Sequence, residues 1–314
     1  MIDKFEPCFY FTNNYFIRLV LPTNAIFNCL LIKKRIFRII LVSNFNKEHS
    51  ILSIFQLYEL CLSIKIIRFI SFLRQNTDTP REIFNGNLDH LYASGFRRIP
   101  VKVLVHGWKS DANHISNILI KNAFLKYYDV NVIVVNWRSG MDENPSDPLA
   151  VAVGMYLATF LQFLGRAGVP LSQVHVVAHS LGAQAAGHAG RNCLLRVRPL
   201  DPPGGTWENS VYCIGRGDAD YVEIIHTYIA GGMLIYPHGH VDFYPNGGEM
   251  MPGCLSSDYW CSHSRAYEYF AESIGLVNGF IGRECRDYEE IRYQTGCYSL
   301  NRSLQMGGYS AKNA

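Results

Sequence analysis

From Ile66 onward, short apolar runs of strand length alternate with longer runs that have the apolar period of a helix. This alternation is typical of parallel strands joined by helices, so it predicts an α/β fold whose mostly parallel central sheet is flanked by helices. The predicted strands are Val101–His106, Asn131–Trp137, Gln173–Ala178, Leu194–Leu200 and Tyr221–Thr227. The predicted helices are Ile115–Tyr127, Pro148–Leu164 with Asp147 as its start signal, Gln184–Gly190 and Ser262–Ser273.

The first 64 residues do not follow this pattern. Their apolar stretch, Ile26–Val42, is interrupted by Lys33, Lys34, Arg35 and Arg38. It is therefore too charged for a membrane span of about 20 residues, and it lacks the cleavage site of a secretory signal. Two interpretations of residues 1–64 stay open: an N-terminal extension, disordered or otherwise unusual, or a wrongly assigned start of the coding sequence. The folded domain is expected to span residues 65–314.

Composition narrows the class of protein. A chain of 314 residues with 48% apolar residues can bury one large core. A net charge of +3 with scattered Lys and Arg provides no electrostatic footprint for nucleic acid. The nine cysteines do not have the spacing of zinc sites, which favours disulfides and an extracellular location. No metal site and no cofactor are expected.

Ser180 is the candidate nucleophile. A serine hydroxyl needs a histidine to take its proton and a carboxylate to orient that histidine. Ser180 lies between an apolar strand and a helix rich in small residues, where a sharp turn would expose its hydroxyl above the sheet. The usual motif is G-x-S-x-G, and here Ala178 stands at its first position and Gly182 at its last. Alanine is the next smallest side chain, so it should fit this turn.

Asp201 and His263 are the candidate partners of Ser180. Asp201 follows a predicted strand and precedes two prolines, which suits the acid of such a site, although a turn-capping aspartate is the alternative interpretation. His263 follows Cys261 at the end of a short cysteine-bounded loop, from which it can reach the site. His226 lies inside an apolar strand and is expected to pack or bond locally. His238 and His240 form a pair without a third convincing metal ligand.

Two amide donors are needed to stabilise the negative charge that develops on a carbonyl oxygen. Leu181, the residue after the nucleophile, can supply one of them. The second is expected from the turn His106-Gly107-Trp108 after an earlier strand, where Gly107 allows a close approach. A plain strand end is the alternative interpretation of this turn.

Six motifs in order, HGW, NVIVVNW, AHSLGAQAAGHAG, PLDPPGG, VEIIHT and CSHSRAYEYF, resemble the animal pancreatic lipase family, especially its insect members. The resemblance covers about Ile66 to Gly308. It implies the α/β-hydrolase fold, a serine esterase with Ser180, Asp201 and His263 as its triad, and the amides of Trp108 and Leu181 as its oxyanion hole.

The resemblance also implies a lid and a set of disulfides. The loop between Cys254 and Cys261 corresponds to the lid, and it contains only Leu255, Ser256, Ser257, Asp258, Tyr259 and Trp260. Such a short lid is similar to that of the phospholipase A1 members, which cleave the sn-1 acyl chain of phospholipids. The implied disulfides are Cys254 with Cys261, Cys285 with Cys297 and, as a weaker inference, Cys193 with Cys213.

Two departures from the family limit what carries over. The resemblance ends near Gly308, so neither a C-terminal β-sandwich nor a colipase partner is expected. Of the acidic calcium site of some members, only Asp218 is retained. The leading hypothesis is a secreted phospholipase A1 that acts on phospholipid or acylglycerol at a membrane or lipid surface. A triacylglycerol lipase or general carboxylesterase is one alternative, and a noncatalytic lipid-binding relative of the yolk type is the other.

Overall fold

A computed structural model of the protein describes residues 67–137, 147–191, 193, 196–293, 297 and 302–309. The chain divides into two units between Lys65 and Ile66, and all described residues belong to the second. The expectations for residues 1–64 and the predicted strand start at Leu194 lie outside the described residues.

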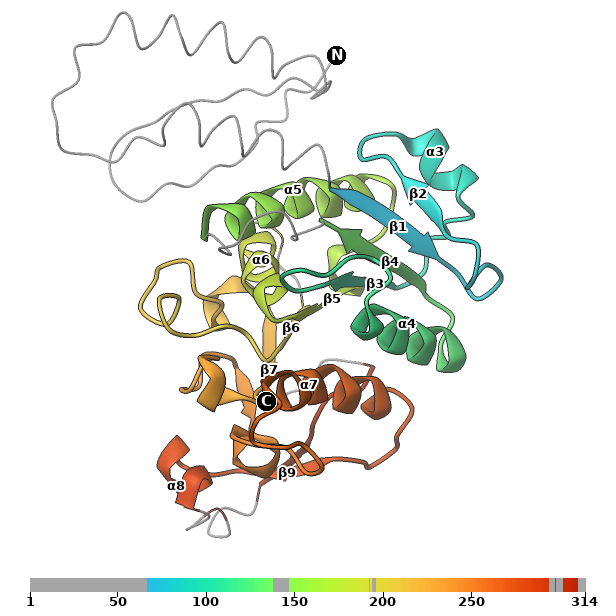
Figure 1. The fold of residues 1–314 in the computed structure, drawn as a ribbon. Coiled ribbons are helices and arrows are strands. Elements are labelled where there is room, and N and C mark those ends of the chain that lie inside the picture. Colours follow the sequence, from blue (N-terminus) through green and yellow to red (C-terminus); the bar gives the residue numbers. More distant parts are fainter. Residues whose placement is uncertain are drawn as a thin grey trace, which may run out of the picture. The chain divides into compact units, whose positions relative to one another are not determined.

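Eight strands form one sheet in the order β2-β1-β4-β3-β5-β6-β7-β8 (Figure 1). They are β1 (Arg68–Phe72), β2 (Arg81–Ile83), β3 (Val101–Val105), β4 (Asn131–Asn136), β5 (Val174–His179), β6 (Arg196–Leu200), β7 (Tyr221–Ile225) and β8 (Val241–Phe243). β1 is antiparallel to both β2 and β4, and all other pairs in the sheet are parallel. The predicted mostly parallel sheet is therefore confirmed.

The register aligns the ends of the central strands. Val105 pairs with Ala178, His179 with Leu200, and Leu200 with Ile225. The carboxyl ends of β3, β5, β6 and β7 therefore meet at one edge of the sheet. The chain leaves β3 toward β4 on one side and then crosses to β5 on the other. The edge between β3 and β5 is thus the switch point where α/β sheets bind their ligands.

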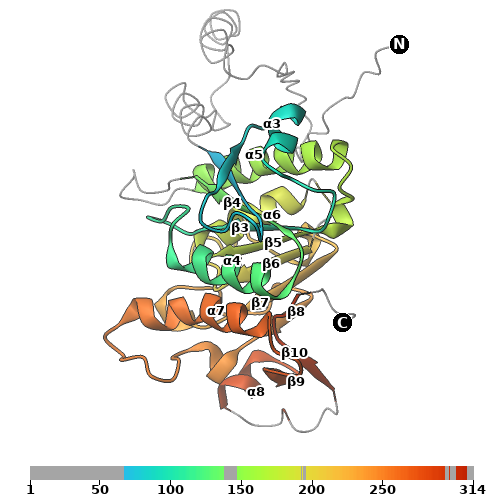
Figure 2. The same ribbon diagram turned by 90° about the vertical axis from the view of Figure 1, so that its right-hand side faces the viewer.

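Helices cover both faces of the sheet (Figure 2). The helices are α3 (Leu88–Ala93), α4 (Ile115–Tyr127), α5 (Asp147–Arg166), α6 (Leu181–Gly190), α7 (Tyr259–Ser273) and α8 (Tyr288–Tyr293). One core cluster contains residues of α5 and α6, and a second contains residues of α4 and α7. Successive residues of a strand belong to different clusters because side chains alternate between the two faces of a sheet. In β3, for example, Val103 belongs to the first cluster and Leu104 to the second.

Several elements were not predicted from the sequence. They include β1, β2, β8, α3 and α8, the short 3₁₀ helices η1 (Leu171–Gln173), η2 (Arg216–Asp218), η3 (Ile229–Gly231) and η4 (Pro245–Gly248), and the antiparallel pair β9 (Ile281–Arg283) and β10 (Ser303–Gln305). The predicted strand and helix bounds agree with the observed ones to within about three residues, with α7 as the informative case. α7 begins at Tyr259, inside the expected loop, because the Asp258 side chain caps it by accepting from the Cys261 amide at 3.1 Å.

Two disulfides join Cys254 to Cys261 and Cys285 to Cys297, as the family resemblance implied. The third expected pair was wrong, because Cys193 and Cys213 are free thiols. Their sulfurs are directed at different neighbours. Cys193 Sγ lies in the core 3.6 Å from the Ala158 carbonyl of α5, whereas Cys213 Sγ lies 4.0 Å from His238 Nδ1. Burial raises the pKa of both thiols to about 11.

Helix α5 contains an apolar window, Leu149–Arg166, that is long enough to cross a membrane by length and composition alone. Of this window, 56% is buried inside the protein, where α5 packs against α6. A mostly buried apolar helix of this kind is typical of a protein core.

The contact between α5 and α6 depends on Gly154. A Cβ at this position would lie 2.4 Å from the Ala185 carbonyl oxygen and 2.4 Å from His188 Cβ. Gly154→Ala should therefore destabilise the protein by about 1–3 kcal/mol, measured by urea unfolding. Gly165→Ala in the same helix is the matched control, because its Cβ would meet only Leu171 carbons at 3.9 Å. It should be neutral or stabilising by up to about 1 kcal/mol, and equal losses in both variants would contradict this account.

Candidate active site

Ser180 occupies a strained turn between β5 and α6. Its backbone has φ 56° and ψ −131°, a combination that few non-glycine residues adopt. The Ser180 amide donates to the Leu200 carbonyl at 2.9 Å, which ties the turn to β6. This is the strand-turn-helix geometry that exposes a nucleophile above the sheet. Ala178 is fully buried within β5, so the first position of the motif accepts alanine here.

Two glycines let the backbone approach this turn. A Cβ at Gly182 would lie 2.4 Å from the His106 carbonyl oxygen, so only glycine lets α6 pack directly against the end of β3. A Cβ at Gly107 would lie 2.8 Å from Ser180 Cβ and 3.3 Å from Ser180 Oγ. The turn after β3 and the turn after β5 are therefore in direct contact, as the sequence predicted for an oxyanion loop.

Asp201 follows β6 and is fully buried. Its Oδ1 accepts from the Thr227 amide at 2.7 Å and from the Tyr228 amide at 3.0 Å, while Oδ2 lies 2.6 Å from His263 Nδ1. Both oxygens of the buried carboxylate therefore have donors, as burial of a charge requires. All three partners are more than 20 residues away in the chain, whereas the alternative interpretation, a turn-capping aspartate, would place them within its own turn.

His263 lies in α7 and is buried. Because a carboxylate only accepts, His263 Nδ1 carries the proton of its bond to Asp201, which leaves Nε2 as the acceptor of the neutral ring. His263 and Ser180 line the same pocket. The structure thus brings Ser180, Asp201 and His263 together from the ends of three distant segments.

His179 contacts His263, and this contact was not predicted from the sequence. His179 Nε2 donates to the His263 carbonyl at 3.2 Å, and the two rings lie 4.4 Å apart. Desolvation, followed by repulsion from His263, holds the pKa of His179 well below its usual value. No second positive charge therefore opposes His263 when it takes a proton. The adjacency of His179 to Ser180 was the one signal available in the sequence.

The candidate oxyanion donors lie on both sides of Ser180. Leu181 is the first residue of α6, and its amide has no partner within the helix because the first amides of a helix lack one. The positive end of the helix dipole also favours an anion there. Trp108 follows Gly107 on the opposing turn and lines the same pocket as Leu181.

His106 holds the opposing turn in place. Its Nδ1 donates to the Gly107 carbonyl at 2.9 Å and its Nε2 accepts from the Trp137 amide at 3.3 Å. The indole of Trp137 donates back to the His106 carbonyl at 2.9 Å. Desolvation by burial, the largest effect, lowers the pKa of His106 to about 4. The ring is therefore neutral with its proton on Nδ1.

The pocket at this edge has a volume of about 280 Å³ and mostly apolar walls. Its lining residues are Trp108, Ser180, Leu181, Pro203, Trp207, Tyr228, Gly231, Met233, Tyr259, Trp260 and His263. Six of these positions were singled out from the sequence, whereas the other five come from loops that only the fold brings together: Pro203, Trp207, Tyr228, Gly231 and Met233. Apolar walls around a few polar groups are typical of a site for an apolar ligand.

The six residues of the expected lid are all exposed beside this pocket. Tyr259 and Trp260, which are 64% and 66% exposed, belong to the first turn of α7 and line the pocket. The structure therefore corrects the expectation that Leu255 to Trp260 form a loop throughout. Because Asp258 caps α7, the irregular part of the expected lid ends at this residue.

Within the residues described, no group of three or more His, Cys, Asp or Glu side chains could hold a metal ion. His240 Nδ1 accepts from the Val222 amide at 3.0 Å. Asp218, the carboxylate retained from the family's calcium site, pairs with the Arg191 guanidinium and accepts from the Gly215 amide at 2.9 Å. Because the positively charged Arg191 already pairs with this carboxylate, the residues here do not fit a calcium site.

The fold and this edge define an α/β hydrolase. The sequence profile of the family described as Lipase matches residues 43–314, and the chain belongs to this lipase family. It is 32% identical to human pancreatic lipase-related protein 3 over 72% of this chain and 54% of that protein. It is 31% identical to rabbit (Oryctolagus cuniculus) pancreatic triacylglycerol lipase over 77% of this chain and 59% of that protein.

Two further similarities mark the limits of these comparisons. The chain is 29% identical to human inactive pancreatic lipase-related protein 1, over 79% of this chain and 60% of that protein. Membership of the family therefore does not by itself establish activity. The solved structure of Est1E from Butyrivibrio proteoclasticus is similar with a TM-score of 0.27 and 13% identity, over 43% of this chain and 46% of that one. The chain spans little more than half the length of the three pancreatic lipases and lipase-related proteins named above.

Gly107 provides a direct test of the oxyanion geometry. In Gly107→Ala, the new Cβ would push against Ser180 and displace the opposing amides. Labelling of Ser180 by a serine-reactive phosphonate should slow by roughly 10²-fold, the usual loss when an oxyanion donor is removed. Gly217→Ala, whose Cβ would meet nothing within 4 Å, should label at the wild-type rate. An unchanged rate in Gly107→Ala would refute the assignment.

His106 should make folding stability depend on pH. Its pKa is about 4 in the folded protein and near 6.5 in the unfolded chain, so only the unfolded chain takes up this proton between those values. Its contribution is fully present above pH 6.5 and is lost as the pH falls to 4, by up to about 1.4 kcal/mol per pH unit. The free energy of unfolding, measured with urea at several pH values in this range, should fall less steeply with decreasing pH in His106→Gln than in wild type. Equal pH dependence in the two proteins would count against a neutral buried His106.

Proposed function

We propose that this protein is a secreted serine hydrolase of lipid esters, and that its substrate is the sn-1 acyl ester of a phospholipid. The main support for this proposal is the geometry of three residues. Ser180 lies on a strained turn and lines the same apolar pocket as His263, and His263 Nδ1 is hydrogen-bonded at 2.6 Å to the buried Asp201. This arrangement matches what nucleophilic catalysis by serine requires.

In the proposed mechanism, Ser180 Oγ attacks the ester carbonyl while His263 Nε2 takes the hydroxyl proton. Asp201 stabilises the imidazolium that forms. The carbonyl oxygen becomes an oxyanion and accepts from the amides of Leu181 and Trp108. When the tetrahedral intermediate collapses, the proton on His263 passes to the leaving alcohol, and an acyl-serine remains. Water, activated by His263, then releases the fatty acid and restores Ser180.

The walls of the pocket and its rim support a lipid substrate. Trp207, Pro203 and Met233 give the pocket apolar surface that suits an acyl chain. Tyr259 and Trp260 line the pocket and are 64% and 66% exposed, and Leu255 of the same segment is 73% exposed; such exposed aromatic and aliphatic side chains favour contact with a lipid surface. A membrane or another lipid surface is therefore the proposed partner.

The short lid favours phospholipid over triglyceride. Only six residues separate Cys254 from Cys261, and the disulfide closes this segment tightly next to the pocket. In the family that the chain resembles, long lids accompany triglyceride lipases and short lids accompany phospholipase A1 members. The two disulfides also support an oxidising, extracellular location.

The test uses the full chain with vesicles of phosphatidylcholine labelled in the sn-1 acyl chain, vesicles labelled in the sn-2 chain, and emulsified triglyceride. We expect release of the sn-1 chain, with the rate reduced by roughly 10⁴-fold or more in Ser180→Ala. Circular dichroism confirms that both proteins are folded. Triglyceride cleavage alone would indicate a neutral lipase. Folded protein that neither cleaves nor takes a phosphonate label would indicate a noncatalytic relative.

A further inference from the structure

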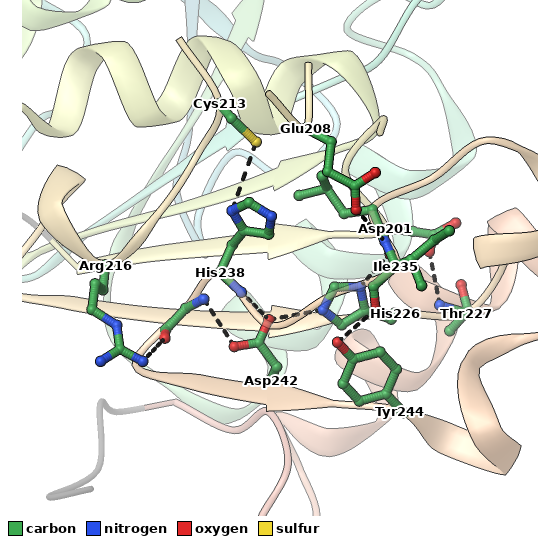
Figure 3. Close-up of polar contacts among 12 residues, drawn as sticks. Asp201, Glu208, Cys213, Arg216, His226, Thr227, Ile235, His238, Asp242 and Tyr244 are labelled. Carbon is green, nitrogen blue, oxygen red and sulfur yellow. Dashed lines mark hydrogen bonds and ion pairs between the residues drawn. The ribbon is translucent and has the colours of Figure 1, made fainter. Parts of the chain in front are cut away.

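His226 lies one residue from the amides that hold Asp201. It follows β7 directly, and the next two amides, of Thr227 and Tyr228, are the donors to Asp201 Oδ1. The His226 amide donates to the Phe243 carbonyl at 2.8 Å, which ties this segment to β8. Its side chain is completely buried, and Figure 3 shows its contact with Asp242.

Both ring nitrogens of His226 face oxygen acceptors. Nδ1 lies 3.0 Å from the Leu234 carbonyl oxygen, and Nε2 lies 2.8 Å from Asp242 Oδ1. A carbonyl oxygen only accepts, so Nδ1 must carry a proton. The Asp242 carboxylate also accepts from the His238 amide at 3.1 Å and the Gly239 amide at 2.8 Å. These amides fix the carboxylate in place, so His226 is held between two oxygen acceptors, the Leu234 carbonyl and the Asp242 carboxylate.

The surroundings fix the His226 ring in one orientation. The ring of Tyr244 stacks on it with centroids 4.2 Å apart and an interplanar angle of 2°. The loop that contains Asp242's amide donors is held from outside by Arg216, which donates to the Gly239 carbonyl at 3.1 Å (Figure 3). With the ring bonded at two opposite atoms and stacked on one face, the His226 side chain has little freedom to turn.

We propose that His226, paired with Asp242, is a positioning residue for the reaction at Ser180. By fixing the backbone of residues 226–228, it aims the Thr227 and Tyr228 amides at Asp201 Oδ1 and leaves Oδ2 directed at His263. Without this constraint, the Asp201 carboxylate can turn away from His263. A displacement of about 1 Å at such a group can cost roughly 10²-fold in rate. The inference rests on the proposed function, since it concerns the rate of that reaction.

The test compares three variants of the full chain on a soluble short-chain ester, p-nitrophenyl butyrate, so that binding to a lipid surface does not enter. His226→Phe keeps a flat ring against Tyr244 and removes both ring nitrogens. Asp242→Asn keeps the shape of the partner and removes its charge. Tyr244→Phe is the matched control: it removes the hydroxyl that donates to the Ile235 carbonyl at 3.0 Å, yet leaves the ring and the bonds of His226 in place.

We expect kcat per folded molecule to fall roughly 10- to 100-fold in His226→Phe and Asp242→Asn, with KM unchanged within about twofold. Tyr244→Phe should lower the melting temperature but keep kcat within about twofold of wild type. A purely structural role would lower the melting temperature in all three variants and leave kcat unchanged in the folded fraction. That result would overturn the inference.

Nitrogen-15 NMR of histidine-labelled protein gives a readout independent of hydrolysis and of variants that fail to fold. In wild type, Nδ1 of His226 should carry a proton because it faces a carbonyl oxygen, and an unprotonated Nδ1 would overturn the inference. The downfield proton of the His263–Asp201 hydrogen bond should weaken or shift in Asp242→Asn and persist in Tyr244→Phe. If wild type shows these signals but hydrolyses no ester, the proposed function fails while the positioning of Asp201 still stands.

Discussion

The common register of four parallel strands is the constraint on which the site depends. Because β3, β5, β6 and β7 are paired without offset at their carboxyl ends, the turns that follow them converge at one edge. Ser180, Asp201 and the opposing glycine turn each follow a different strand, and α7 brings His263 to the same edge. A shift of one residue in any pair would send the functional side chain to the other face of the sheet.

Buried polar groups then set the orientation of each functional residue. Three histidines around the site have different environments. His106 and His179 are neutral because burial disfavours their charged forms, whereas both ring nitrogens of His226 face oxygen acceptors. The burial of His106 and His179 therefore keeps additional positive charge away from His263.

Much of the fold was accessible from the sequence because it depends on local patterns. The helix Ile115–Tyr127 and the strand beginning at Asn131 were predicted at their observed positions, since the apolar period of 3.6 or 2 residues reflects which side chains face the core. The three-residue strands β2, β8, β9 and β10 were missed, because a segment this short has no period to detect. The helix start at Tyr259 was missed because the capping aspartate lies within an otherwise irregular segment.

The sequence alone determined the chemical types at the site: a serine before a small-residue helix, an aspartate after a strand, and a histidine after a cysteine-bounded segment. These signals are local, because each depends on the few residues around it. Only the tertiary structure decided that Thr227 and Tyr228 hold Asp201, that His179 supports His263, and that Cys193 and Cys213 remain apart. Such contacts join residues far apart in the chain, and their geometry is set by strand register and helix packing, which no local pattern encodes.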